Sequence, residues 1–520
     1  MKKLLVVLGV SSMILSCGSS QNKSTAEASS TPQTKDVTAY ANSITSAELK
    51  EALYIYASDE FEGRETGQPG QKKAVEYLKN QYIDLGIPSA QPNNDYFQEV
   101  PLQVLKVPTV QLIANGKTYT AMDDYMSVLS SQDGTFKADD IVYAGYGIDD
   151  EKYSSYSNLD VNGKIVLIKS GEPKNADGNF VISGNSEASK WSNFRQAYAS
   201  KRDAAKDRGA KAVLFYYPEI YEMAKRRFAS SRGRMSVKGK TEDFYYFFIT
   251  EGLAKSLYPN LDTSETSETV SATLSIDYKN DATDFESENV AALIKGSEKP
   301  NEVIVISAHL DHEGVKDGKI YNGADDDGSG TVAMLEIAEA FKTAAKNGQG
   351  PKRSILFLHV TGEEKGLLGS SYYTDVDPII PLENTVANLN IDMIGRTNPK
   401  REGGDRNYVY LIGSDKLSTE LHNISEAVNS KYCNVDLDYT YNDDNDPNRF
   451  YYRSDHYNFA KNNVPVIFYF NGTHDDYHQP SDTPDKIEYD LLENRTRLIF
   501  HTAWELANRD NRIIVDKATR

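Results

Sequence analysis

Cysteine is almost absent from this chain, whose 520 residues include only Cys17 and Cys433. If Cys17 is acylated, no intramolecular disulfide can form, and a chain of this length must rely on the size of its core. The sequence has no Gly-x-Ser-x-Gly segment and Cys433 has no reactive neighbours, which argues against serine or cysteine hydrolysis. Basic residues are outnumbered, and the net charge of −19 disfavours nucleic acid as a partner.

Long apolar runs are scarce as well. The run "LLVVLGVSSMIL" follows Lys2 and Lys3 and is too short to span a bilayer comfortably. The quartet that ends at Cys17, "ILSC", resembles a bacterial lipobox, which implies cleavage before Cys17 and a lipid on its thiol. We therefore expect a signal peptide at 1–16 and a flexible, Ser- and Thr-rich tether at 17–40. The protein would be exported and lipid-anchored to the bacterial cell envelope, in the periplasm or at the outer membrane; a cleaved signal peptide with a chance cysteine is the alternative.

Three folded segments are expected beyond the tether. Residues 41–131 begin with a helix that Thr45 and Glu48 can cap, and a second helix ends near Gly86. Residues 132–260 have a different sequence pattern, in which short apolar strand candidates are separated by polar turns. Within them "NGKIVLIKSGEP" and "RGAKAVLFYY" resemble a protease-associated domain, with an ordinary mixed α/β insertion as the alternative. Residues 261–520 would complete the larger domain.

The last segment alternates apolar strand candidates with helix candidates. The strands include "EVIVISA", "SILFLHV", "TVANLNI" and "VPVIFYFN", and the helices include "SGTVAMLEIAEAFKTAAKN". This alternation predicts an α/β fold with a mixed, mostly parallel sheet flanked by helices, into which a smaller, β-rich α/β domain is inserted. In such sheets the functional site lies beyond the carboxyl ends of the strands.

Histidines and carboxylates follow four of these strands. His309 and Asp311 come after the first, Glu363 and Glu364 after the second, Asp392 after the third, and His474 and His478 after the fourth; "NGADDDGSG" precedes a helix. Two imidazoles with several carboxylates suit zinc or a similar divalent ion. Carboxylates crowded in one cleft would repel each other, and two cations bridged by a shared carboxylate remove that repulsion.

The motifs "SAHLDH", "NGADDDGSG", "TGEEKGLLGS", "NLNIDMIG" and "DYHQPSDT" together resemble the M28 family of two-zinc peptidases, most of which are aminopeptidases. The resemblance covers about 40–125 and 286–510. It implies that His309 and Asp392 bind one zinc ion, that Glu364 and His478 bind the other, and that Asp326 bridges both.

The same resemblance implies roles for three further residues. Glu363 would be the general base that takes a proton from the attacking water, and Asp311 would hold the free ring nitrogen of His309. Tyr477 would stabilise the oxyanion. The substrates would be peptides or proteins, and the most expected activity is release of N-terminal residues.

Several alternatives are weighed against this assignment. A calcium-binding EF-hand fails, because a loop with Gly328 at its sixth position would start at Gly323 and place Met334 where Glu is needed. His474 is a rival to His478 as ligand, while His312 is expected outside the first ring of ligands and His359 in the core. Carboxypeptidase or other amidohydrolase activity, a one-zinc glutaminyl cyclase and a non-catalytic binding lipoprotein share the fold and remain alternatives.

Overall fold

The computed structural model describes residues 37–128, 131–193, 196–229, 233–239, 243–264, 266–401 and 403–517. The predicted signal peptide, Cys17 and most of the predicted tether lie outside these residues. Helix α1 (Val37–Ala41) begins inside the predicted tether, and Tyr40 and Ala41 are buried in the core. The prediction of a tether was therefore wrong for residues 37–40, because Tyr40 packs on a helix whose position the local sequence does not reveal.

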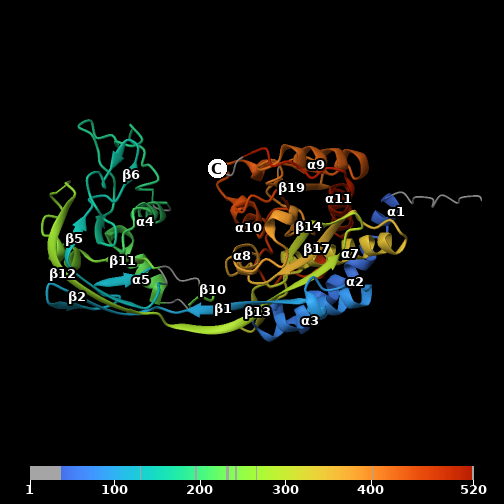
Figure 1. The fold of residues 1–520 in the computed structure, drawn as a ribbon, viewed down its shortest axis with the longest axis horizontal. Coiled ribbons are helices and arrows are strands. Elements are labelled where there is room, and N and C mark those ends of the chain that lie inside the picture. The colour runs from blue at the N-terminus through green and yellow to red at the C-terminus, as the bar shows by residue number, and fades with distance from the viewer. Residues whose placement is uncertain are drawn as a thin grey trace, which may run out of the picture. The chain divides into compact units, whose positions relative to one another are not determined.

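A nine-stranded mixed sheet forms the larger domain (Figure 1). Its four central strands, β17, β14, β18 and β21, are parallel to one another, whereas β1 pairs antiparallel with β10 and β13, β13 with β17, and β19 with β21. The prediction of a mixed α/β sheet is confirmed, with its parallel part at the centre. The strand order is β10 (Arg234–Val237), β1 (Phe97–Leu105), β13 (Ala282–Ile294), β17 (Arg353–Val360), β14 (Lys299–His309), β18 (Thr385–Ile391), β21 (Val466–Phe470), β19 (Tyr408–Ile412) and β20 (Asp436–Asp438).

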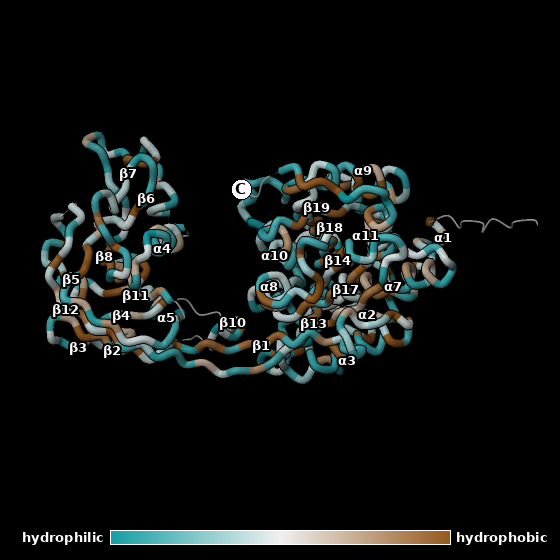
Figure 2. The backbone as a smooth tube through the Cα atoms, in the orientation of Figure 1, coloured by the Kyte–Doolittle hydropathy of each residue, from teal (hydrophilic) through white to brown (hydrophobic). Residues whose placement is uncertain are grey.

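Helices pack on both faces of this sheet, as alternate side chains of β14 show. Ile304 and Ile306 join the core formed with α2 (Ser46–Tyr56), α7 (Gly330–Lys346) and α11 (Tyr489–Asn508). Val303 and Val305 point to the opposite face, which α8 (Leu368–Asp375) and α10 (His456–Ala460) cover. Figure 2 shows the apolar stretches that result along the central strands. A strand buried on both faces reads as a continuous apolar run, which is why the sequence pattern revealed it.

Local signals fix the ends of several helices. The Thr45 hydroxyl accepts a hydrogen bond from the Glu48 amide at the start of α2, as the capping pattern predicted. Helix α3 (Pro69–Leu85) ends at Gly86, whose φ of +70° favours glycine. Helix α9 (Thr419–Tyr432) begins with the Ser418 side chain accepting from the Leu421 amide. These local contacts satisfy main-chain groups at the helix ends and so set where the helices begin and end.

The second domain is built on an eight-stranded sheet. Its order is β3 (Lys117–Tyr119), β2 (Thr109–Ala114), β12 (Glu268–Lys279), β5 (Gly134–Tyr143), β8 (Ile165–Lys169), β9 (Ala212–Tyr216), β11 (Tyr245–Ile249) and β4 (Tyr125–Ser127), with helices α4 (Ala197–Asp207), α5 (Pro218–Ala229) and α6 (Glu251–Leu257). The sheet thus extends past the predicted bounds of 132–260 at both ends. The reason is the long-range pairing of β2 with β12, which places Leu112 opposite Ile276.

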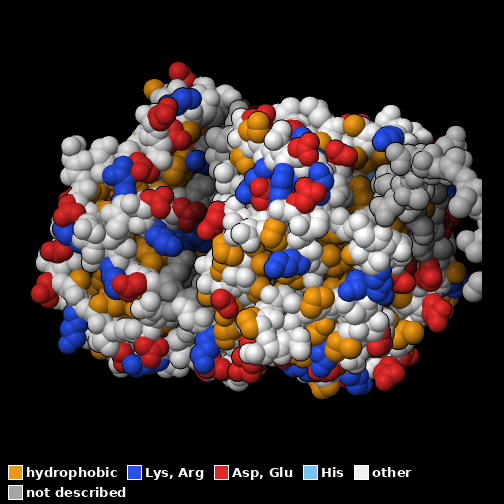
Figure 3. Space-filling model, turned by 45° about the vertical axis from the view of Figure 1, so that its right-hand side comes forward, with side chains coloured by type: hydrophobic (Ala, Val, Ile, Leu, Met, Phe, Trp, Pro, Cys, Tyr) orange, Lys and Arg blue, Asp and Glu red, His pale blue; other side chains and the backbone are white. Residues whose placement is uncertain are grey.

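Figure 3 shows Lys and Arg interspersed with Asp and Glu on the face that it draws, although the chain carries a net charge of −19. Among the described residues, every helix is too short or too polar to cross a lipid bilayer.

Candidate metal centre

The predicted site residues meet at one edge of the nine-stranded sheet. Strand β14 ends at His309, and the residues after β17, β18 and β21 supply the other groups that follow strands. Because the four strands are parallel, their carboxyl ends lie at the same edge, as expected for an α/β site. The loop before α7 adds Asp326. The side chains gathered here are His309, Asp311, His312, Asp326, Glu363, Glu364, Asp392 and His478.

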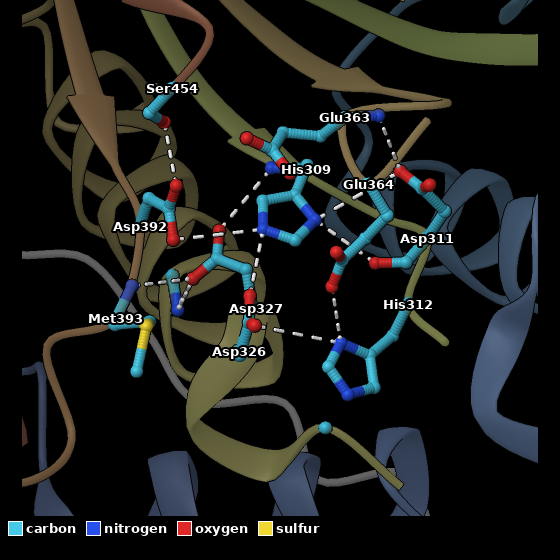
Figure 4. A network of polar contacts seen from close by, with 12 residues as sticks. His309, Asp311, His312, Asp326, Asp327, Glu363, Glu364, Asp392, Met393 and Ser454 are labelled. Carbon is cyan, nitrogen blue, oxygen red and sulfur yellow. Dashed lines mark hydrogen bonds and ion pairs between the residues drawn. The ribbon is translucent and has the colours of Figure 1, made fainter. Parts of the chain in front are cut away.

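Asp326 lies at the centre of this cluster (Figure 4). Its Oδ1 is 3.1 Å from His309 Nε2, and its Oδ2 is 3.0 Å from His478 Nε2. His309 Nε2 is also 3.6 Å from Asp392 Oδ1, whereas His478 Nε2 is 3.2 Å from Glu364 Oε2. Each oxygen of one carboxylate therefore faces a separate group of one imidazole and one further carboxylate. This is the arrangement expected of a carboxylate shared between two ions.

Hydrogen bonds from neighbouring residues hold these side chains in place. Ser454 donates to Asp392 Oδ2 at 2.6 Å. Asp327 accepts from the main-chain amides of His309, at 3.2 Å, and of Met393, at 3.0 Å, and so joins the ends of β14 and β18 (Figure 4). Such supporting contacts orient metal ligands and tune their affinity. The sequence analysis assigned no role to Ser454, which has no motif of its own, or to Asp327, which lies in "NGADDDGSG" beside the predicted ligand Asp326.

Asp311 contacts the site through both its main chain and its side chain. The Nδ1 atom of His309 is 2.9 Å from the main-chain carbonyl of Asp311 and 3.9 Å from its carboxylate. The carboxylate instead accepts from the Thr66 hydroxyl at 2.7 Å and from the Glu363 amide at 3.1 Å. The side chain thereby positions the start of the loop that carries Glu363. The carbonyl is thus closer to the ring nitrogen than the carboxylate is, and the role of the Asp311 side chain toward His309 stays a prediction.

Three other histidines lie in different surroundings. His312 is buried, and its Nδ1 lies 2.8 Å from Glu364 Oε1, which places it nearer the centre of the site than we expected (Figure 4). His474 lies outside the cluster, since its Nε2 pairs with Asp325 Oδ2 at 3.1 Å. His359, expected in the core, is buried there with its Nε2 2.9 Å from the Tyr82 hydroxyl.

The electrostatics of the cluster are those of imidazoles surrounded by carboxylates. Burial opposes protonation of His309, but Asp326 and Asp392 raise its pKa well above 6.5. Burial likewise opposes protonation of His478, yet Asp326 and Glu364 raise its pKa to about 10. Burial raises the pKa of Asp326, and its ion pairs with both imidazoles outweigh this and bring the pKa well below 3.8. Cations that bind these groups would displace the imidazole protons, so their affinity would rise with pH.

The donor atoms fit divalent cations. Among the described side chains, His309 Nε2, Asp326 Oδ2 and Glu364 Oε1 are buried and form no hydrogen bond; their polar neighbours, at 2.8 to 3.1 Å, are other imidazoles and carboxylates of the cluster. Buried polar atoms normally have hydrogen-bond partners, and imidazole nitrogens and carboxylate oxygens crowded together without them suit a bound cation. Imidazole nitrogen and carboxylate oxygen are ligands that zinc accepts. The residues present therefore fit the predicted cofactor.

Glu363 and Tyr477 line a cavity beside the cluster together with Asp326 and Asp392. Burial raises the pKa of the Glu363 carboxyl well above 4.5; His309 opposes this, and Asp392 adds to it. Burial and nearby carboxylates likewise raise the pKa of the Tyr477 phenol, whose ring stacks on that of His478 at 3.9 Å. A raised carboxyl pKa suits a group that exchanges protons near neutrality.

Residues 289–503 match the sequence profile of Peptidase family M28. Leucine aminopeptidase 1 of Sclerotinia sclerotiorum is 29% identical over 227 residues, which are 42% of this chain and 56% of that protein. Aminopeptidase YwaD of Bacillus subtilis is 30% identical over 166 residues, 29% of this chain and 34% of that protein. The structure of an aminopeptidase from Aneurinibacillus sp. strain AM-1 aligns over 93% of this chain and 99% of its own at 20% identity, with a TM-score of 0.48.

The family match relates residues 289–503 to metallopeptidases, a class of hydrolases. The segment that matches family M28 contains every predicted site residue, so the resemblance read from the motifs is confirmed for this part of the chain. The chain spans about half the length of the first of these two curated relatives and about a third of the second.

The support of Asp392 by Ser454 gives a first prediction. Replacing Ser454 by Ala removes the 2.6 Å hydrogen bond to Asp392 Oδ2, and we expect zinc affinity to fall about 10–100-fold. Zinc competition with a chromophoric chelator measures this. Thr502→Ala is the matched control, because Thr502 is a buried hydroxyl in α11 that donates to Leu498 O at 2.9 Å. Equal zinc affinity in the Ser454 and Thr502 variants would contradict the role of Ser454 in supporting Asp392.

Proposed function

We propose that this protein is a two-zinc aminopeptidase that releases N-terminal residues from peptides. The observation that carries the proposal is the position of Asp326, whose two oxygens face His309 and His478 at 3.1 and 3.0 Å. One zinc ion would bind His309, Asp392 and Asp326, and the other would bind His478, Glu364 and Asp326. His312 lies close enough to Glu364 to fix that carboxylate in place.

Glu363, Asp311 and Tyr477 would have separate roles in the reaction. When bound, the two ions would polarise the scissile carbonyl and lower the pKa of the attacking water. Glu363 is the general base: its carboxylate takes the proton from water and passes it to the leaving amine. Asp311 holds the main chain of Glu363 through the amide, so the carboxylate stays aimed into the cavity. The Tyr477 hydroxyl lies at the same cavity, where it donates to the oxyanion.

Carboxylates in the cavity wall favour a free α-amino group on the substrate. Asp326, Asp392 and Glu363 all line the cavity, and an ammonium group gains from such neighbours. We expect an aminoacyl amide with a free N-terminus to be cleaved and its N-acetylated form to be resistant. Chromogenic leucyl amide and acetyl-leucyl amide test this directly, and equal rates on both would refute aminopeptidase action while leaving amidohydrolase activity intact.

Export and anchoring complete the proposal. The lysines, apolar run and "ILSC" quartet at the start of the sequence support a lipid on Cys17 and a place in the bacterial cell envelope. The eight-stranded domain would be a protease-associated domain that shapes access to the cleft. Labelling cells with a fatty-acid analogue tests the anchor: the label should appear on the wild-type chain and be lost in Cys17→Ala, and an unlabelled wild-type chain would refute it.

A further inference from the structure

The cavity beside the metal centre has two chemically different walls. The residues next to the metal site are Asp326, Glu363 and Asp392, and the rest of the lining is mainly aromatic. The aromatic side chains come from β21, from the loop after it and from the turn before α10, and they belong to one cluster: Phe450, Phe468, Phe470 and Tyr477. A substrate residue next to the scissile bond would enter between these walls.

One cation lies on this cavity. Arg453 is exposed, lines the cavity, and has its guanidinium 4.8 Å from the centre of the Phe450 ring. Within the described part of the chain, it has no carboxylate partner within 4 Å. Other arginines nearby are paired: Arg396 contacts Asp476 at 3.1 Å, and Arg401 contacts Asp436 at 2.6 Å. A guanidinium stacked on an aromatic ring keeps its outer N–H groups free for a ligand.

Arg453 is adjacent to the candidate metal centre in the chain and at the cavity. It directly precedes Ser454, which holds the candidate ligand Asp392 at 2.6 Å. It also lines the same cavity as Asp326, Glu363 and Asp392, so a substrate in that cavity can reach its side chain. Carboxylate is the ligand that a guanidinium binds best, through two parallel hydrogen bonds.

We propose that Arg453 is a specificity-determining residue that binds a carboxylate of the substrate next to the scissile bond. This inference rests on the proposed peptidase function and narrows its substrate class to peptides with an acidic group at that place. The carboxylate has two sources: the side chain of an N-terminal Glu or Asp residue, or the C-terminus of a dipeptide. Both present the same group to the guanidinium, at different distances from the reacting carbonyl.

The test compares substrates that differ only in that carboxylate. Full-length enzyme is assayed on glutamyl and glutaminyl amides of one chromophoric amine, on Ala-Ala and Ala-Ala-amide, and on a leucyl amide as reference. We expect the wild type to prefer the acid over its amide in one pair by about tenfold or more in kcat/KM. Preference in the first pair identifies the side chain as the source, and preference in the second identifies the C-terminus.

Variants then assign the preference to Arg453. Arg453→Gln should abolish it while leaving the leucyl amide within about twofold of wild type, and Arg453→Lys should retain part of it. Arg449→Gln is the matched control, because Arg449 is exposed four residues earlier and stacks on Tyr452, outside the cavity. No preference in either pair, or an equal loss on all substrates in Arg453→Gln, overturns the inference. If the wild type cleaves none of these substrates, the proposed function itself fails.

Discussion

Replacing Glu363 by Gln will lower kcat on an aminoacyl amide by about 10²–10⁴-fold while the bound metal remains. The amide side chain has nearly the same shape but cannot take a proton from water. Glu363 lines the cavity without belonging to either group of candidate ligands around Asp326, so its loss leaves the ligand set intact. Steady-state kinetics and metal analysis of the same preparation measure the two effects.

The control for this variant is Glu339→Gln, the same change on the exposed side of α7. It should match the wild type in both rate and metal content. If Glu363→Gln retains wild-type kcat, the general base is another group. If it loses metal together with activity, Glu363 is a ligand and the assignment of roles after β17 is wrong.

Replacing Asp326 by Ala will remove both cations and reduce activity to background. The Asp326 carboxylate faces both groups, so its removal takes one ligand from each of the two proposed ions. Ligands that bind only the folded state stabilise it, so zinc should raise the melting temperature of the wild type and leave that of the variant unchanged. Thermal unfolding with and without added zinc, together with metal analysis, measures this.

Asp475→Ala is the matched control, since Asp475 is an exposed carboxylate on the loop that carries His478. It should retain the metals, the activity and the response to zinc. An Asp326 variant that still binds two metals and still hydrolyses substrate would show that Asp326 does not bridge the ions.

The sequence predicted the position of the site because of the way parallel strands end. Apolar runs such as "EVIVISA" identified the central strands, and the polar residues after each strand must meet at one sheet edge. His309, Asp392 and Glu364 could thus be grouped without knowing how the strands are ordered. The choice of His478 over His474 rested on the family resemblance, and the structure brings His478 to Asp326 and pairs His474 with Asp325.

The features that the sequence did not predict depend on contacts between residues far apart in the chain. Ser454 reaches Asp392 across 62 positions, and no local pattern marks a serine for that task. The carbonyl of Asp311 lies closer to His309 than its carboxylate does, which depends on the path of a turn. The predicted bounds of the second domain, 132–260, were too narrow for the same reason. Strand β2 joins the eight-stranded sheet only through its pairing with β12.

The central claim is that two cations share the Asp326 carboxylate, and crystals grown with zinc test it most directly through anomalous scattering at the zinc edge. We expect two peaks about 3.5–4 Å apart, one next to His309 and Asp392 and the other next to His478 and Glu364. A single peak, or two peaks of which only one contacts Asp326, would contradict the account.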